Sequence, residues 1–462
     1  MASPSTRRIY RAALCLGWGV ALSFFSPAVE AANIGTVVPV VGQVADLVYD
    51  AARNLVYLTN PARSTIEIYS VEGRRLAGNI PTGLQPGSLA LSTDGNTLYV
   101  ANIGANSVSA ISLITQQIAA DYFVGSRPDA IAIGYDGNVV ILGTAGLLRL
   151  DPVTGRITPV PISPPAIPPA GLPAITPSPT PATFFAGLVS TASRNLIIGL
   201  SNNRLFVYEV ASGTVLRSRN VTGLRALMSA STDGSRFMAG PYLFDTQTLA
   251  ILGRAGTAAA NLTGGSAFSV DGNSVYAWFS NQIQFNPLNT NNPQNPGGAQ
   301  IPGAIAGQIT AQPTQAVLQV LRSSSLAQEL GLRLPEPIVS KMIASTDGQN
   351  LFANSTSGML VIPIGQLSNL PVLDVSATNV VLSVDACNRG IATATVLVRN
   401  LGGGRMTFAA TINNLAAPVI LNRGSGVAPT TLTISWDPRT VTTRGTLQFA
   451  VLIVSPEAVN LE

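Results

Sequence analysis

The sequence predicts an all-β fold, in which a seven-bladed β-propeller is followed by an immunoglobulin-like β-sandwich and one insertion carries a short helix. Three observations support this prediction. A hairpin signature recurs seven times along the chain. Glycine (43 residues) and proline (32 residues) are abundant, as a fold with many tight turns requires. Only 10% of the residues are charged, compared with about 25% in an ordinary soluble domain.

Residues 1–31 are predicted to form a signal peptide. Three arginines precede the apolar stretch Ala12–Phe25, and Ala31 stands at a small-residue cleavage position. Because Arg7 and Arg8 are adjacent, the general secretory and the twin-arginine routes both stay open. We expect an exported protein that is periplasmic, on the cell surface or extracellular, with no transmembrane segment after cleavage.

Removal of the signal peptide would change the charge and the cysteine content. The net charge would fall from +4 to +2, because three arginines and one glutamate are lost. No basic cluster along the sequence suggests nucleic acid as a partner. Cys387 would be the single cysteine of the mature chain, which therefore has no internal disulfide.

The repeat is best seen in "STDGNTLYVAN", residues 92–102. Its Asp-Gly pair closes a tight hairpin, because both residues tolerate positive φ. A small apolar strand precedes the turn, an alternating strand follows it, and two more strands complete a unit of roughly 40 residues, which is the pattern of a propeller blade. The copies are centred on Asp50, Asp94, Asp136, Ser193, Asp233, Asp271 and Asp347. We expect these aspartates to form turns rather than to act as catalytic carboxylates.

The motif "LYVAN" (98–102), with "VGSRP" (124–128) between two units, resembles the YVTN-type seven-bladed β-propeller repeat of exported bacterial proteins. The resemblance covers about residues 34–368, and the relatives by fold that it implies include lactonases and quinoproteins. We expect Thr36–Val41 to pair with Met359–Ile364 and so to close the ring, because this pairing removes two open sheet edges.

Two long gaps between copies predict insertions at residues 158–185 and 286–337. The first contains ten prolines and is expected to be extended. The second contains an amphipathic stretch, Thr314–Leu332, which predicts the short helix. By strand count both insertions join a fourth strand to the next first strand, so both should lie on one face at the mouth of the channel. Such loops are candidates for binding, and insertions without a ligand are the alternative.

Residues 370–462 form a third region, in which alternating strands are separated by glycine and asparagine turns. The strand segments are 370–385, 392–413, 430–438 and 445–455. The pattern predicts an immunoglobulin-like sandwich and resembles the BACON-type modules of secreted bacterial proteins. Since such modules usually add one more edge strand, we expect the sandwich to lack its last strand.

The composition excludes several kinds of catalytic site. The chain has no histidine, which rules out Ser-His-Asp and Cys-His nucleophilic sites and the usual zinc ligand sets. No glycine-rich phosphate loop opens a helix, and no segment matches an oxygen-rich calcium loop. We therefore predict no catalytic residue, no metal site and no cofactor.

Scattered charges on loops at the channel mouth are the candidate binding residues: Asp46, Arg63, Arg127, Asp129, Arg204 and Arg225. Arg127 and Asp129 are the most suggestive pair, because they lie in a connection between two blades. A structural Arg–Asp contact that fixes this connection is the alternative.

These observations favour a secreted, non-catalytic propeller that binds a protein or polysaccharide at the channel-mouth face, or serves as a scaffold. The alternative is a lactonase-like hydrolase that uses a metal ion held by carboxylates in the channel, and a redox quinoprotein is a third option. Three or more oxygen ligands converging on the channel axis would favour the hydrolase.

Overall fold

The structure is a computed structural model, and it describes residues 33–162, 186–221, 224–255, 263–279, 316–383, 390–412, 419–437, 439 and 449–460. The predicted signal peptide lies outside the described residues. So do most residues of the two predicted insertions. In the part of the chain that is described, no helix combines the length and the apolar character needed to cross a membrane.

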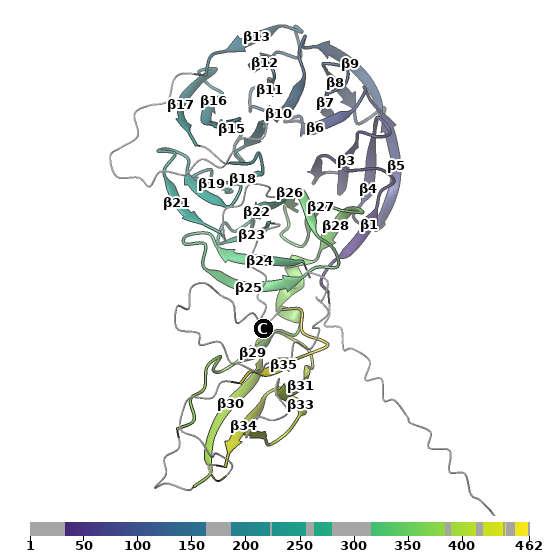
Figure 1. Cartoon of the computed structure of the whole chain (residues 1–462). Coiled ribbons are helices and arrows are strands. Elements are labelled where there is room, and N and C mark those ends of the chain that lie inside the picture. Colours follow the sequence, from purple (N-terminus) through teal and green to yellow (C-terminus); the bar gives the residue numbers. More distant parts are fainter. Residues whose placement is uncertain are drawn as a thin grey trace, which may run out of the picture. The chain divides into compact units, whose positions relative to one another are not determined.

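Seven four-stranded antiparallel sheets make up the region from residue 36 to residue 362, and we number them blades 1 to 7 (Figure 1). Blade 1 contains β2 (Leu47–Asp50), β3 (Leu55–Asn60), β4 (Thr65–Ser70) and β5 (Arg75–Pro81). Blade 2 contains β6 (Pro86–Leu91), β7 (Thr97–Asn102), β8 (Ser107–Ser112) and β9 (Gln117–Phe123). Blade 3 contains β10 (Pro128–Ile133), β11 (Val139–Gly143), β12 (Gly146–Leu150) and β13 (Ile157–Val160).

The second half of the ring repeats this order. Blade 4 contains β14 (Ala186–Ser190), β15 (Leu196–Ser201), β16 (Arg204–Glu209) and β17 (Thr214–Asn220). Blade 5 contains β18 (Met228–Ala230), β19 (Arg236–Ala239), β20 (Tyr242–Asp245) and β21 (Ile251–Arg254). Blade 6 contains β22 (Gly264–Phe268), β23 (Ser274–Phe279), β24 (Val317–Arg322) and β25 (Gln328–Arg333). Blade 7 contains β26 (Ile338–Ala344), β27 (Leu351–Ser355), β28 (Gly358–Ile362) and β1 (Thr36–Pro39).

The first strand of the described chain closes the ring, as predicted. β1 pairs antiparallel with β28, with Thr36 opposite Val361 and Pro39 opposite Gly358. The innermost strand of each blade contacts the innermost strand of the next, and β26 of blade 7 contacts β2 of blade 1 (Figure 1). The ring therefore has no gap between its first and last blades.

The core lies between neighbouring blades. Leu205 and Val207 of blade 4, for example, share one apolar cluster with Phe237 and Phe244 of blade 5. The two phenylalanine rings stack with their centroids 5.2 Å apart. Because both faces of each sheet are covered, the middle strands are buried along almost their whole length, which explains their continuous apolar sequences.

The recurring Asp residues form turns, as predicted. In blade 5, the Ser231 hydroxyl donates to Asp233 Oδ1 (2.6 Å) and accepts the N–H of Arg236 (3.0 Å). Asp233 Oδ1 also accepts the N–H of Ser235 (3.0 Å), and Gly234 has a φ of +72°. The same Ser-x-Asp-Gly arrangement recurs in blades 2, 6 and 7.

Antiparallel alternation gives the ring two distinct faces. The connections from one blade to the next and the loops between second and third strands lie on one face, which we call the connection face. The loops between first and second strands and between third and fourth strands lie on the opposite face, which we call the turn face. The Asp-Gly turns thus belong to the turn face.

The helix predicted at Thr314–Leu332 is wrong. The described part of this stretch forms β24 and β25, the two outer strands of blade 6. The spacing of its apolar residues suits a helix, but as a strand it places Leu318 and Val320 in the core next to β23, where an isolated helix would leave the edge of β23 unpaired. The turn between the strands puts Leu326 at a φ of +55°.

The boundaries of the insertions also need correction. Ile157–Val160 form β13, so the first insertion begins later than residue 158, and residues 163–185 stand between blades 3 and 4. Residues 280–315 stand between β23 and β24, the second and third strands of blade 6, and not between two blades. Both attachment points nevertheless belong to the connection face, because both kinds of loop lie there.

The third region contains two small sheets after a short 3₁₀ helix, η1 (Ile364–Asn369). One sheet contains β29 (Leu373–Val375), β30 (Ala392–Asn400), β34 (Thr430–Trp436) and β32 (Val419–Leu421). The other contains β33 (Ser425–Val427), β31 (Thr407–Ile412) and β35 (Val451–Val454), with β35 at its end. The immunoglobulin-like and BACON-type assignments stay predictions. So does the missing last strand, because residues 440–448 and 461–462 lie outside the described residues.

Candidate functional site

Asp46 ties three blades together. It stands just before β2 of blade 1, and its Oδ2 accepts the N–H of Leu89 in β6 of blade 2 (2.8 Å). Its Oδ1 lies 2.9 Å from Nζ of Lys341 in β26 of blade 7. The side chain of Asp46 is only 12% exposed. Its carboxylate is therefore used within the ring rather than presented to solvent.

Lys341 was missed by the sequence reasoning. It is the only lysine of the chain, and it stands on an innermost strand. The signal available in the sequence was its distance from the hairpin turn: Lys341 stands four residues before Ser345, as Asp46 stands four residues before Asp50, and Ser345 and Asp50 both lie where the first strand enters the turn. Opposite charges at equivalent positions of the two blades that meet at the closure predict an ion pair.

Arg127 and Asp129 form the structural contact that the sequence left open as an alternative. Arg127 Nε lies 2.8 Å from Asp129 Oδ1, and the two side chains are 42% and 15% exposed. Burial raises the pKa of Asp129, and the charge of Arg127 opposes this effect. The pair holds the start of β10, where the main-chain oxygen of Arg127 also accepts the N–H of Thr144 (3.1 Å).

The other three predicted residues belong to three different loops of the ring. Arg63, in the loop after β3, is 3.8 Å from Glu67 Oε1. Arg204 begins β16 and donates through Nη1 to the main-chain oxygen of Ile162 (3.2 Å). Arg225 is half-buried in the connection between blades 4 and 5. All six predicted residues belong to the connection face, and Arg127 and Asp129 among them are in direct contact.

Among the described residues, the connection face exposes one of its arginines and three large apolar side chains to solvent. Arg63 is 50% exposed, whereas the carboxylates of Asp46 and Asp129 are largely buried. Three exposed apolar side chains lie in or beside three successive blade connections: Val41 (79%), Leu84 (62%) and Phe123 (72%). Such exposed apolar groups, in a loop region next to cations, are typical of interaction surfaces.

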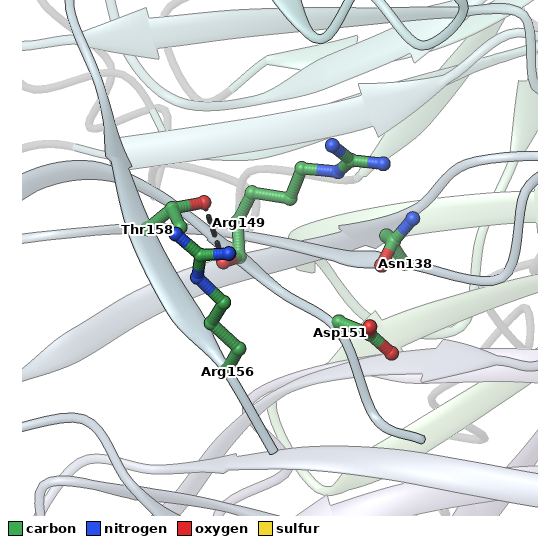
Figure 2. Close-up of a pocket in the computed structure, with 5 residues that line it drawn as sticks. All are labelled: Asn138, Arg149, Asp151, Arg156 and Thr158. Atoms are coloured by element: carbon green, nitrogen blue, oxygen red, sulfur yellow. Dashed lines mark hydrogen bonds between the residues drawn. The ribbon is translucent and has the colours of Figure 1, made fainter. Parts of the chain in front are cut away.

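Two cavities lie on blades 2 and 3, and both include loops of the turn face. One, of about 200 Å³, is lined by Asn138, Arg149, Asp151, Arg156 and Thr158 (Figure 2). The other, of about 410 Å³, shares Asn138 and Asp151 with the first and is also lined by Asp94 and Asp136.

Several polar groups of these cavities already have partners within the fold, although the buried Nε of Arg149 has none among the described residues. Arg149 Nη2 lies 3.0 Å from Asp136 Oδ2, and Asp151 accepts the N–H of Val153 (2.9 Å). The hydroxyl of Thr158 contacts the main-chain oxygen of Arg149 (3.4 Å), as Figure 2 shows. In the described ranges, no group of three or more Asp, Glu, Cys or His side chains is placed to hold a metal ion.

Comparisons with known proteins do not identify a family. No family model matches the chain, and no curated protein matches it. A search of solved structures finds the β-propeller domain of Cps50 (Swd1) from Myceliophteria thermophila, which is 14% identical over 72% of this chain and 99% of that domain, with a TM-score of 0.49. This similarity is too low to support an argument, so the propeller assignment rests on the strand pairing described above.

Proposed function

We propose that the protein is an exported, non-catalytic binding or scaffold protein, which takes a protein or polysaccharide on the connection face of its propeller. The observation that carries this proposal is the exposure of Val41, Leu84 and Phe123 in or beside three successive blade connections, on the face that also carries the partly exposed Arg63 and Arg127. A ligand covering these side chains would remove apolar surface from water, and this supplies a driving force for binding.

The proposal is tested with the purified mature chain against glycans and cell-surface protein fractions. We expect saturable binding that the double variant Leu84→Ser/Phe123→Ser weakens about tenfold, because two exposed apolar contacts are lost. The matched control is Ile114→Ser/Val153→Ser. These side chains are 75% and 92% exposed, and both belong to turns of the turn face.

Two outcomes would overturn the proposal. Equal loss of binding in both double variants would place the ligand elsewhere or make the contact non-specific. Calcium-dependent hydrolysis of lactones by the mature chain would replace the binding role with the lactonase-like alternative. The export step is checked separately, by sequencing the N-terminus of the protein recovered from outside the cytoplasm.

A further inference from the structure

The larger of the two cavities on blades 2 and 3 is lined by turns of both blades, and we call it the blade 2–3 cavity. Its volume of about 410 Å³ falls in the range typical of ligand pockets. Three carboxylates line it, those of Asp94, Asp136 and Asp151, together with serine and threonine residues. None of the described residues that line it is an arginine or a lysine. The cavity therefore combines negative charge with hydroxyl groups.

A buried tyrosine of blade 2 also lines this cavity. Tyr99 is only 7% exposed, and its ring packs in the core cluster between blades 2 and 3. Its hydroxyl forms no hydrogen bond with any described residue, whereas the hydroxyl of Tyr122 donates to the main-chain oxygen of Pro152 (2.7 Å). Burial raises the pKa of Tyr99 to about 12, so the hydroxyl stays protonated at neutral pH. A ligand in the cavity would give this polar group the partner that the fold does not supply.

The equivalent space between blades 1 and 2 is filled by a guanidinium group of the chain itself. Nη1 of Arg53 donates to the main-chain oxygen of Gly95 (2.6 Å) and lies 2.8 Å from Asp50 Oδ2. Nη2 of Arg53 donates to Asn96 Oδ1 (3.0 Å). Burial raises the pKa of Tyr57 to about 12, and the nearby charge of Arg53 opposes this effect. A tyrosine, a main-chain oxygen and an asparagine thus surround this guanidinium.

In the next copy of the repeat, glycine takes the place of the arginine. Gly95 stands at the position of Arg53 and has a φ of +71°. The positions around the guanidinium recur as Tyr99, Gly137 and Asn138, and all three line the blade 2–3 cavity. The main-chain oxygen of Gly137 and Oδ1 of Asn138 accept no hydrogen bond from the described residues. The acceptors of the space are therefore repeated, but the cation is not.

Two of the three carboxylates have no cation beside them. Asp136 pairs with Arg149, whereas Asp94 and Asp151 form no ion pair with a described residue. Hydrogen bonds from hydroxyls of their own turns are the main cause that lowers the pKa of Asp94 and of Asp151, so both are ionised at neutral pH. In the described ranges, the carboxylates are not placed to share one metal ion. The charge thus favours an organic cation whose donors are spread over several atoms.

We propose that the blade 2–3 cavity binds a guanidinium group, carried by an arginine side chain of a protein partner or by a free small molecule. A guanidinium presents five N–H donors in a fixed plane, and the acceptors here are spread over a main-chain oxygen, a side-chain amide, carboxylates and a phenol. Hydrogen bonds between a guanidinium and a carboxylate are charge-assisted and strong. The site lies on the turn face, so it goes beyond the function proposed for the connection face.

The test is calorimetric titration of the full mature chain with glycyl-arginyl-glycine, blocked at both ends. The same peptide with citrulline in place of arginine keeps the shape and removes the charge, and a third peptide carries lysine. We expect the arginine peptide to bind about tenfold or more tightly than the citrulline peptide. Titration with n-butylguanidinium separates the two sources of the group. Similar affinity would show that a free small molecule is sufficient, and tighter binding of the peptide would indicate a protein partner.

Asp151→Asn removes one charge from the cavity and keeps an oxygen acceptor for its turn. We expect it to weaken binding of the arginine peptide about tenfold. Asp245→Asn is the matched control, because Asp245 begins the equivalent turn of blade 5. Each carboxylate accepts the hydroxyl of the threonine three residues later. The control changes the net charge equally and should bind within about twofold of the wild type, since a charge on a separate blade is screened by salt.

Tyr99→Phe removes the hydroxyl and keeps the ring in the core. We expect it to weaken binding of the arginine peptide about threefold, as the loss of one neutral hydrogen bond predicts. Tyr57→Phe is the control, because Tyr57 has the same place in the first copy of the repeat, where Arg53 already fills the space. It should leave the binding unchanged. Thermal melting of each variant separates loss of binding from loss of folding.

Four results would overturn the inference. No saturable binding of either guanidinium probe would remove the site. Equal affinity for the citrulline peptide would show that the charge is not recognised, and equal or tighter binding of the lysine peptide would assign an ammonium ligand. Equal weakening by Asp151→Asn and Asp245→Asn would show that net charge alone attracts the peptide. Each of these results leaves the connection-face proposal standing, because Leu84→Ser/Phe123→Ser should bind the arginine peptide as the wild type does.

Discussion

A buried asparagine ends the second strand of blade 1 (Asn60) and of blade 2 (Asn102). Asn102 is fully buried, and its amide donates to the hydroxyls of Ser109 (2.7 Å) and Ser107 (3.2 Å). Its oxygen accepts the hydroxyl of Thr82 (3.2 Å). A Cβ at Gly83 would lie 2.5 Å from this amide, so glycine is required in the preceding connection. Blade 1 repeats the pairing, because a Cβ at Gly42 would lie 2.6 Å from Oδ1 of Asn60.

We predict that Asn102→Ala destabilises the propeller by about 2–3 kcal/mol, because it leaves buried hydroxyls without their partner. The measurement is urea unfolding of the mature chain. Asn203→Ala, at an exposed turn position, serves as the control and should change the free energy of unfolding by less than about 0.5 kcal/mol. Similar losses from both substitutions would refute the buried amide as a determinant of stability.

At the scale of the element, the Ser-x-Asp-Gly turn couples stability to pH. Hydrogen bonds, above all that of Ser231, lower the pKa of Asp233 from 3.8 to about 2. A carboxyl whose pKa is depressed in the folded state contributes stability above its unfolded pKa. This contribution is therefore lost as the pH falls from about 4 to about 2. The same cause lowers the pKa of Asp94, Asp271 and Asp347.

We expect Ser231→Ala to raise the pKa of Asp233 and to destabilise the protein by about 0.5–1 kcal/mol at pH 7. The part of this loss that depends on the carboxylate should shrink at pH 2, where Asp233 is partly protonated in both proteins. Urea unfolding at the two pH values measures the effect. Thr232→Ala, at an exposed position of the same turn, is the control. A loss of equal size at both pH values would contradict the coupling.

In blade 6, the secondary structure of one segment depends on the strand beside it. The amphipathic pattern of residues 317–332 is compatible with a helix, yet β23 needs a partner on its outer edge. The turn at Leu326 is equivalent to the turn at Gln116 in blade 2. Both residues have a positive φ, and the N–H of each bonds to the main-chain oxygen four residues earlier, at Arg322 and Ser112. Alignment of these two turns would have placed a strand on each side of Leu326. Local periodicity without this alignment could not separate the two structures.

At the scale of the whole molecule, stability depends on closure of the ring. Val38 of β1 is 8% exposed and belongs to a core cluster with Met359, Phe352 and Leu47. Val38→Asp would bury a carboxylate in this cluster and detach β1 from β28. We expect it to destabilise the protein by about 3 kcal/mol or more.

Hydrogen exchange measures this effect directly, since the amides of β28 should lose protection together with those of β1. Thr36→Asp, at an exposed position of the same strand, is expected to leave both the exchange and the free energy of unfolding nearly unchanged. Retained protection of β28 in the Val38→Asp protein would show that β1 is not needed for closure.

The sequence by itself determined the seven blades, their turns and the closing strand, because hairpin chemistry is local and repeats along the chain. The tertiary structure alone decided which distant residues meet: Asp46 with Lys341 at the closure, and Arg219 of blade 4 with the main-chain oxygen of Leu249 in blade 5. The physical reason is that such meetings depend on strand register and on the packing of one blade against the next. Neither quantity is encoded in the spacing of residues within a single repeat.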